Sequence, residues 1–285
     1  LLPLKEQGVN MGFQVITDSP AVLADRLKSS DLDLAMIPSV EYFKSADSYR
    51  LVPGVCIASR GEVGTVLFLT KKPIDEIRSI AADNRSRTSV ALLKILFSFR
   101  SDLSIHPFPP DLDSMLVDHS AALIIGDSAF KLSNLDSSIT VYDLSEEWFR
   151  QTGKTFVHAV VAARKNIYLS QSQKKFIQQV KAEGCGRVKE VVQDYKKLSS
   201  VDIEVLEDYL EKKIEYDFDE MALDGLTHFN NLCYQRGIIS KKFPIKFLSK
   251  NFLLNFYSLY CDFLLNAFDI LTITSVINNI NNSKK

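Results

Sequence analysis

Short apolar runs alternate with helix-like patterns over residues 12–163. The runs predict strands at residues 12–16, 32–37, 63–70, 79–82, 103–106, 121–125, 139–142 and 155–163. Helices are predicted at residues 21–27, after a cap signal at Ser19 and Pro20, and at residues 86–99, where apolar residues recur at helical spacing. Strands that alternate with helices are typical of an α/β fold with parallel sheets and crossover connections.

The pattern changes at about residue 170. Amphipathic helices are predicted at residues 170–183, 187–198, 201–210 and 219–236, with little strand signal between them. We expect this helical segment to pack back onto the first part of the α/β fold.

Residues 251–285 form an apolar tail that polar residues interrupt. A membrane-spanning helix needs about 20 predominantly apolar residues, and an Asp at its centre costs about 3 kcal/mol. Asp262 and Asp269 therefore argue against a span, as do Asn255 and Asn266. A helix that covers the core, or a subunit contact in a homo-oligomer, is favoured over a membrane-surface helix or a segment without stable structure.

Composition narrows the class of partner. The 285 residues carry 34 Lys and Arg against 35 Asp and Glu, so no general basic field would hold a nucleic acid, and a small molecule is the better expectation. Cys56, Cys185, Cys233 and Cys261 form no CxxC pair and share no metal-like spacing with a histidine, so no metal site is expected. Unpaired cysteines and the absence of a visible signal peptide favour the cytoplasm.

The sharpest local signal is Ser86-Arg87-Thr88-Ser89, which follows a predicted strand and opens a predicted helix. Three hydroxyl groups and a cation at a helix N-terminus, with its free N–H groups, would bind a carboxylate or phosphate. Simple capping of the helix by Ser86 or Thr88 explains the same residues equally well.

Other polar residues follow predicted strands. Gly126 and Asp127 end an apolar strand, where ligands collect in open α/β sheets, and Asp127 could act as an acid–base group or as a helix cap. Ser39 follows the strand that stops at Pro38 and could face the same cleft. His158 lies within an apolar strand, where a core role is twice as common as a catalytic one.

Several segments occur together in one order. They are Leu2-Pro3-Leu4 and residues 31–42, 61–63, 86–90, 109–112, 121–129, 143–148, 152–153 and 156–164. In this order, and above all in the succession of SRTSV, IGD and EW…TG, the chain resembles the chorismate dehydratases of futalosine-dependent menaquinone biosynthesis. The resemblance covers residues 1 to about 240.

The resemblance implies a fold like the type II periplasmic binding proteins, with two α/β lobes around a ligand cleft and a helical C-terminal segment. The lobes would comprise residues 1–83 (lobe 1, first part), 84–157 (lobe 2) and 158–250 (return to lobe 1), with 251–285 as an extra tail. It also implies loss of water from chorismate to give 3-[(1-carboxyvinyl)oxy]benzoate, without a cofactor or metal.

On this resemblance Ser86 and Asp127 are the catalytic candidates. Ser39, Ser86, Arg87, Thr88, Ser89, Gly126, Asp127 and His158 would bind the substrate.

The chain also departs from the family pattern. An initial strand that ends in a substrate-contacting Asn is expected before Leu1, so the chain is interpreted as truncated at its N-terminus. His158 and Val161 stand where aromatic residues are common, and Lys154-Thr155 replaces Leu-Pro. Three alternatives stay open: the 1,4-dihydroxy-6-naphthoate synthase of the same pathway, which shares the fold, a non-catalytic solute-binding protein for a carboxylate, and an inactive remnant of the enzyme.

Overall fold

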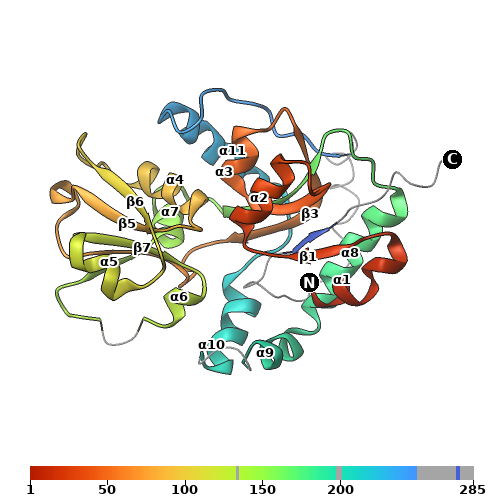
Figure 1. Cartoon of the computed structure of the whole chain (residues 1–285), viewed down its shortest axis with the longest axis horizontal. Helices are drawn as coiled ribbons and strands as arrows, with labels where there is room; N and C mark the ends of the chain where they lie inside the picture. The colour runs from red at the N-terminus through yellow and green to blue at the C-terminus, as the bar shows by residue number, and fades with distance from the viewer. Residues whose placement is uncertain (133–134, 197–200, 249–273, 277–285) are drawn as a thin grey trace.

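Two lobes lie side by side in the computed structural model, which describes residues 1–132, 135–196, 201–248 and 274–276 (Figure 1). Within these residues the strands form two five-stranded sheets. Their orders are β1-β10-β2-β9-β3 in the first lobe and β6-β5-β7-β4-β8 in the second. The two-lobed α/β architecture predicted from the sequence is confirmed.

The first lobe combines an early and a late part of the chain. Its strands are β1 (Val15–Thr17), β2 (Leu34–Pro38), β3 (Tyr49–Ser59), β9 (Phe156–Arg164) and β10 (Thr274–Val276). Its helices before the crossing are α1 (Leu2–Gln7), α2 (Pro20–Lys28) and α3 (Ser39–Lys44). Those after the return are α8 (Gln171–Cys185), α9 (Val188–Lys196), α10 (Ile203–Asp208) and α11 (Glu220–Gln235).

The second lobe is continuous in sequence. Its strands are β4 (Val66–Thr70), β5 (Ser79–Asp83), β6 (Ser104–Phe108), β7 (Ala121–Ile125) and β8 (Thr140–Asp143). Its helices are α4 (Arg87–Leu96), α5 (Leu112–Asp118), α6 (Asp127–Phe130) and α7 (Leu144–Thr152). Alternate strand residues point to opposite faces. One face of the sheet packs in the cluster that contains α4 and α7, and the other packs with α5 and α6.

The lobes divide the chain differently from the expected boundary at residues 83 and 84. Strands β4 and β5 precede that boundary, yet both pair within the second sheet. The chain therefore crosses to the second lobe between β3 and β4 and returns between α7 and β9. The returning chain forms β9 from Phe156, and the helices α8 to α11 follow it.

The sheets are mixed, so the expectation of parallel sheets is wrong in part. Strand β5 is parallel to β6 and β7, but β4 is antiparallel to β7 and β8, and β9 is antiparallel to β2 and β3. Strands β4 and β9 each enter a sheet directly from the other lobe. Each therefore starts at the cavity between the lobes and runs antiparallel to its neighbours.

Most of the predicted elements are present, with small shifts at their ends. The long strand β3 was not predicted, because Pro53 and Gly54 interrupt its apolar pattern. At the same place its pairing with β9 shifts register, between Leu51 and Cys56. The predicted tail helix lies outside the described residues, apart from the strand β10. No helix in the described part of the chain is long and apolar enough to cross a membrane.

An aromatic cluster joins the two lobes. Trp148 of α7, Phe156 of β9 and Phe229 of α11 pack with ring centroids 5.0 to 5.8 Å apart. Gly225 brings α11 against the returning segment so closely that a Cβ there would lie 1.9 Å from the carbonyl oxygen of Thr155. The cluster and this close approach pack α7 of the second lobe and β9 of the first lobe against the same helix, α11.

Candidate active site

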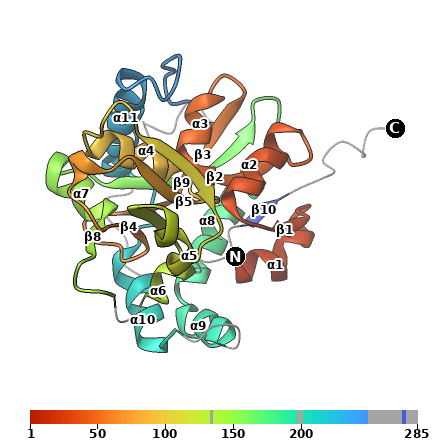
Figure 2. The same ribbon diagram turned by 60° about the vertical axis from the view of Figure 1, so that its left-hand side comes forward.

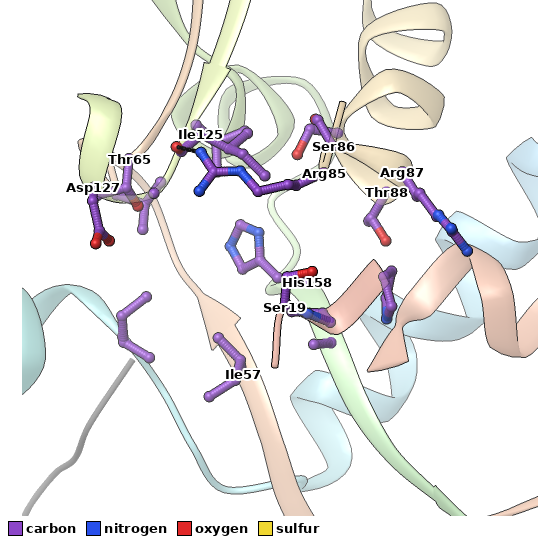
Figure 3. A pocket seen from close by; sticks show the side chains of 18 of the residues that line it. Ser19, Ile57, Thr65, Arg85, Ser86, Arg87, Thr88, Ile125, Asp127 and His158 are labelled. Atoms are coloured by element: carbon purple, nitrogen blue, oxygen red, sulfur yellow. Dashed lines mark hydrogen bonds between the residues drawn. The ribbon is translucent and has the colours of Figure 1, made fainter. Parts of the chain in front are cut away.

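A cavity of about 180 Å³ lies between the lobes, at the ends of strands from both sheets (Figure 3). Its polar lining comprises Ser19, Thr65, Arg85, Ser86, Arg87, Thr88, Ser89, Asp127, His158 and Tyr209, with Gly126 beside them. Its apolar lining comprises Pro20, Pro38, Ile57, Val63, Val66, Ile125, Ala159 and Ile214. An apolar enclosure with a few polar groups is the usual form of a small-molecule site.

Ser86 has an unused hydroxyl in this cavity. It is the N-cap residue of α4, but its side chain makes no capping hydrogen bond. The residue is 5% exposed, and its Oγ has no hydrogen-bond partner among the described residues. Figure 3 shows the hydroxyl directed into the cavity. A buried polar atom without a partner is costly, so Ser86 is suited to bind a ligand atom.

The rest of the Ser86–Ser89 segment is divided between the cavity and the fold. Thr88 and Ser89 are buried in the lining, and Thr88 Oγ1 accepts a hydrogen bond from the backbone N–H of Val40 at 3.4 Å. Arg87 donates to both carboxylate oxygens of Asp25, at 2.9 and 2.6 Å. This ion pair joins α4 of the second lobe to α2 of the first and raises the pKa of Arg87. Arg87 thus serves chiefly to hold the lobes together.

Gly126 and Asp127 lie at another edge of the cavity. Gly126 has a positive φ of 62° and donates its N–H to the carbonyl of Thr65 at 2.8 Å, which fixes the turn from β7 into α6. The Asp127 carboxylate accepts a hydrogen bond of 2.6 Å from the hydroxyl of Tyr195 in α9. Figure 2 shows α6 beside the helices α9 and α10. A first-lobe tyrosine therefore orients a second-lobe carboxylate.

His158 of β9 lies centrally in the cavity (Figure 3). Its Nε2 is 2.9 Å from Ser59 Oγ and 3.4 Å from Ser145 Oγ. Burial lowers the pKa of His158 to about 4, because the surroundings disfavour the charged form. The ring is neutral at pH 7 and offers a hydrogen bond rather than a charge.

Ser39 is not brought to the cavity. Its hydroxyl is fully buried and donates to the carbonyl of Val157 at 2.6 Å, which ties the start of α3 to β9. The position of Ser39 directly after a strand predicts a side chain that faces the cleft, but the turn into α3 directs this side chain to β9.

Four polar lining residues were not among the predicted site residues: Ser19, Thr65, Arg85 and Tyr209. Ser19 is the N-cap residue of α2. Arg85 directly precedes the Ser86–Ser89 segment and forms an ion pair with Asp83. Thr65 and Tyr209 share a hydrogen bond of 2.8 Å, and burial raises the pKa of Tyr209. The glycines before Thr65 marked a turn there, whereas nothing in the helical pattern around Tyr209 distinguishes it from a core residue. Within the described residues, no group of three or more His, Cys, Asp or Glu is arranged to hold a metal ion.

Comparison with known proteins identifies the family of this chain. The family model described as "Menaquinone biosynthesis" matches residues 2–235. The chain belongs to the menaquinone biosynthesis family. The chorismate dehydratase of Thermus thermophilus is 29% identical to this chain over 233 residues, which cover 76% of this chain and 86% of that protein.

Several solved structures have a fold similar to that of this menaquinone biosynthesis family protein. A protein from Archaeoglobus fulgidus is similar with a TM-score of 0.58 and 14% identity, covering 82% of this chain and 92% of the other. The aliphatic sulphonate-binding protein SsuA of Escherichia coli has a TM-score of 0.53 at 13% identity, covering 80% and 78%. SsuA from Xanthomonas axonopodis bound to MOPS has a TM-score of 0.52 at 11% identity, covering 80% and 83%. At these identities the likeness concerns the fold, which is that of two-lobed periplasmic binding proteins.

Proposed function

We propose that the protein is a chorismate dehydratase, which converts chorismate to 3-[(1-carboxyvinyl)oxy]benzoate and water. The observation that carries the proposal is the buried, unpartnered Ser86 hydroxyl at the N-terminus of α4, aimed into an apolar cavity. Chorismate is a cyclohexadiene ring with two carboxylates, and this site offers apolar walls together with a carboxylate-binding helix end. The similarity to the Thermus enzyme supports the same choice.

The reaction asks little of the protein. The ring loses the hydroxyl at C4 and the proton at C3 as one molecule of water, and it becomes aromatic. Much of the driving force therefore lies in the substrate. The protein must hold the ring, bind the carboxylates and handle one proton.

The side chains of the cavity divide these tasks. Ser86, Thr88 and Ser89 bind a carboxylate at the start of α4. Asp127, held by Tyr195, accepts the proton. His158 is neutral, and Ser59 and Ser145 hold its Nε2, so it positions the ring or the leaving hydroxyl by hydrogen bonding without adding charge.

Incubation of the purified chain with chorismate tests the proposal. Loss of the diene absorbance and a product lighter than chorismate by one water, identified by mass and chromatography, are the expected results. A matched reaction with Asp127→Asn should be slower by about a hundredfold, which is within the usual range for an acid–base group. Tight binding of chorismate without turnover would contradict the proposal and favour a solute-binding protein. Turnover of the cyclic naphthoate precursor instead would favour the sister synthase.

A further inference from the structure

Arg85 lies in the turn between β5 and α4, next to Ser86. Its Nε and Nη2 donate to the two carboxylate oxygens of Asp83, at 2.9 and 2.6 Å, and Nη2 also approaches the carbonyl oxygen of Ile125 at 3.5 Å. Asp83 is 2% exposed at the end of β5. A buried carboxylate therefore fixes one edge of the planar guanidinium group.

The other edge of the Arg85 guanidinium is available to a ligand. The side chain is 38% exposed and lines the cavity, and Nη1 has no hydrogen-bond partner among the described residues. Figure 3 shows one terminal nitrogen at the Ile125 carbonyl and the other directed toward the space between Asp127 and His158. Arg87, by contrast, is held by Asp25 and lies 3.7 Å from Glu41.

A dicarboxylate ligand in this cavity needs a second cationic or N–H donor besides the start of α4. The start of α4 can bind one carboxylate, but a second carboxylate would enter near Asp127 in a largely apolar enclosure. Leaving that charge without a partner would be costly. A guanidinium group matches carboxylate geometry, and a side chain that is already fixed loses little rotamer entropy on binding. Hydrogen bonding to Asp83 raises the pKa of Arg85, so the group stays charged.

We propose that Arg85 binds one of the two carboxylates of the substrate and selects for ligands with two negative charges. The inference rests on the proposed function, which supplies a dicarboxylate substrate. It assigns separate anion subsites to neighbouring residues: Ser86 with the start of α4 for one carboxylate, and the free edge of Arg85 for the other.

Calorimetric binding to the full chain tests the inference. The ligands are 3-[(1-carboxyvinyl)oxy]benzoate, with two carboxylates, 3-methoxybenzoate, with the ring carboxylate, and 2-phenoxyacrylate, with the side-chain carboxylate. In Arg85→Gln the affinity for the dicarboxylate should fall at least tenfold. One monocarboxylate should weaken similarly, and the other should stay within twofold. Equal losses for all three ligands, no loss, or no binding of any of them by the wild type would overturn the inference.

Two further variants separate binding from folding. Arg85→Gln alone leaves the Asp83 charge buried without its partner, so Asp83→Asn with Arg85→Gln removes both charges and should show the same selective loss. Arg100→Gln is a matched control, because Arg100 also pairs with an Asp two residues away, Asp102 at 2.9 Å, outside this cavity. It should leave all three affinities unchanged.

Turnover of chorismate by the wild type tests the proposed function separately. A wild type that binds the dicarboxylate through Arg85 without turnover would overturn the dehydratase and leave the Arg85 assignment standing.

Discussion

The hydroxyl of Tyr195 donates a hydrogen bond of 2.6 Å to the carboxylate of Asp127, from a residue that lies 68 positions away in the chain and in the other lobe. The bond links α9 to α6 and sets the orientation of the carboxylate at the edge of the cavity. Asp127 is therefore positioned by a contact between the lobes and not by its own short helix.

Tyr195→Phe should lower turnover more than it lowers stability. Without the hydroxyl the carboxylate is free to rotate, so kcat should fall about tenfold, while loss of a partly buried hydrogen bond should reduce the free energy of unfolding by about 1 kcal/mol. Steady-state kinetics and urea unfolding measure the two effects. Tyr168→Phe is the control, because Tyr168 is well exposed and does not line the cavity. If Tyr195→Phe and Tyr168→Phe have the same kcat, Tyr195 does not position the Asp127 carboxylate for turnover.

Ser86→Ala should reduce activity and leave stability nearly unchanged. A hydrogen bond to a charged group contributes about 1.5–3 kcal/mol, so kcat/KM should fall about 10- to 100-fold. The free energy of unfolding should change by less than about 0.5 kcal/mol, because Ser86 Oγ bonds no described residue.

Ser170→Ala is the matched contrast to Ser86→Ala. Ser170 is also an N-cap residue, but it forms a complete capping box with Gln173 at the start of α8. Its replacement should cost about 1 kcal/mol of stability and leave kcat/KM unchanged. Thermal unfolding and kinetics of both variants give the comparison. A Ser86→Ala protein with full activity, or with the larger loss of stability, would show that Ser86 is an ordinary cap.

His158 should make the protein less stable as the pH falls. Its pKa in the folded protein is about 4, below the unfolded value of about 6.5, so the unfolded chain binds the proton first. The contribution of His158 to the free energy of unfolding is fully present above pH 6.5 and is lost as the pH falls toward 4. The total loss is about 3 kcal/mol. Urea unfolding at pH 7 and pH 4.5 measures it.

The His158→Gln variant isolates this contribution from that of the carboxyl groups. It should lose less stability than the wild type between the two pH values. An identical pH dependence in His158→Gln and the wild type would contradict a neutral, buried His158.

Gly225→Ala should destabilise the junction of the lobes. The added Cβ would lie 1.9 Å from the Thr155 carbonyl oxygen, so α11 or the returning segment must move, at a cost of about 1–3 kcal/mol or more. Gly184→Ala, also in a helix, has its nearest contact at 3.9 Å and should stabilise by about 0.5–1 kcal/mol. Thermal unfolding of both variants distinguishes them. Similar changes in the two would show that the close approach at Gly225 carries no constraint.

Local patterns in the sequence determined where most strands and helices lie and which segments meet at the cavity. Apolar spacing located β7 to its residue limits, and Ser19 with Pro20 located the start of α2. These features depend on a few neighbouring residues, whose backbone preferences and side-chain periodicity act over one or two turns. The polar segment from Ser86 and the pair Gly126 and Asp127 both line the cavity, because each lies within three residues of the end of a strand.

Only the tertiary structure decided which of these side chains face the cavity and which serve the fold. Ser39 donates to Val157, Arg87 lies in the cavity lining but pairs with Asp25, and Arg85, which was not predicted, lines the cavity as well. Strand direction was decided in the same way, since β4 and β9 enter their sheets from the opposite lobe. The outcomes for Ser39, Arg87 and the two strands depend on partners tens of residues away, whereas Arg85 is held mainly by Asp83, two residues before it. Position along the chain shows that a polar group lies at a strand end, but the free energy of its contacts with distant residues decides where it points.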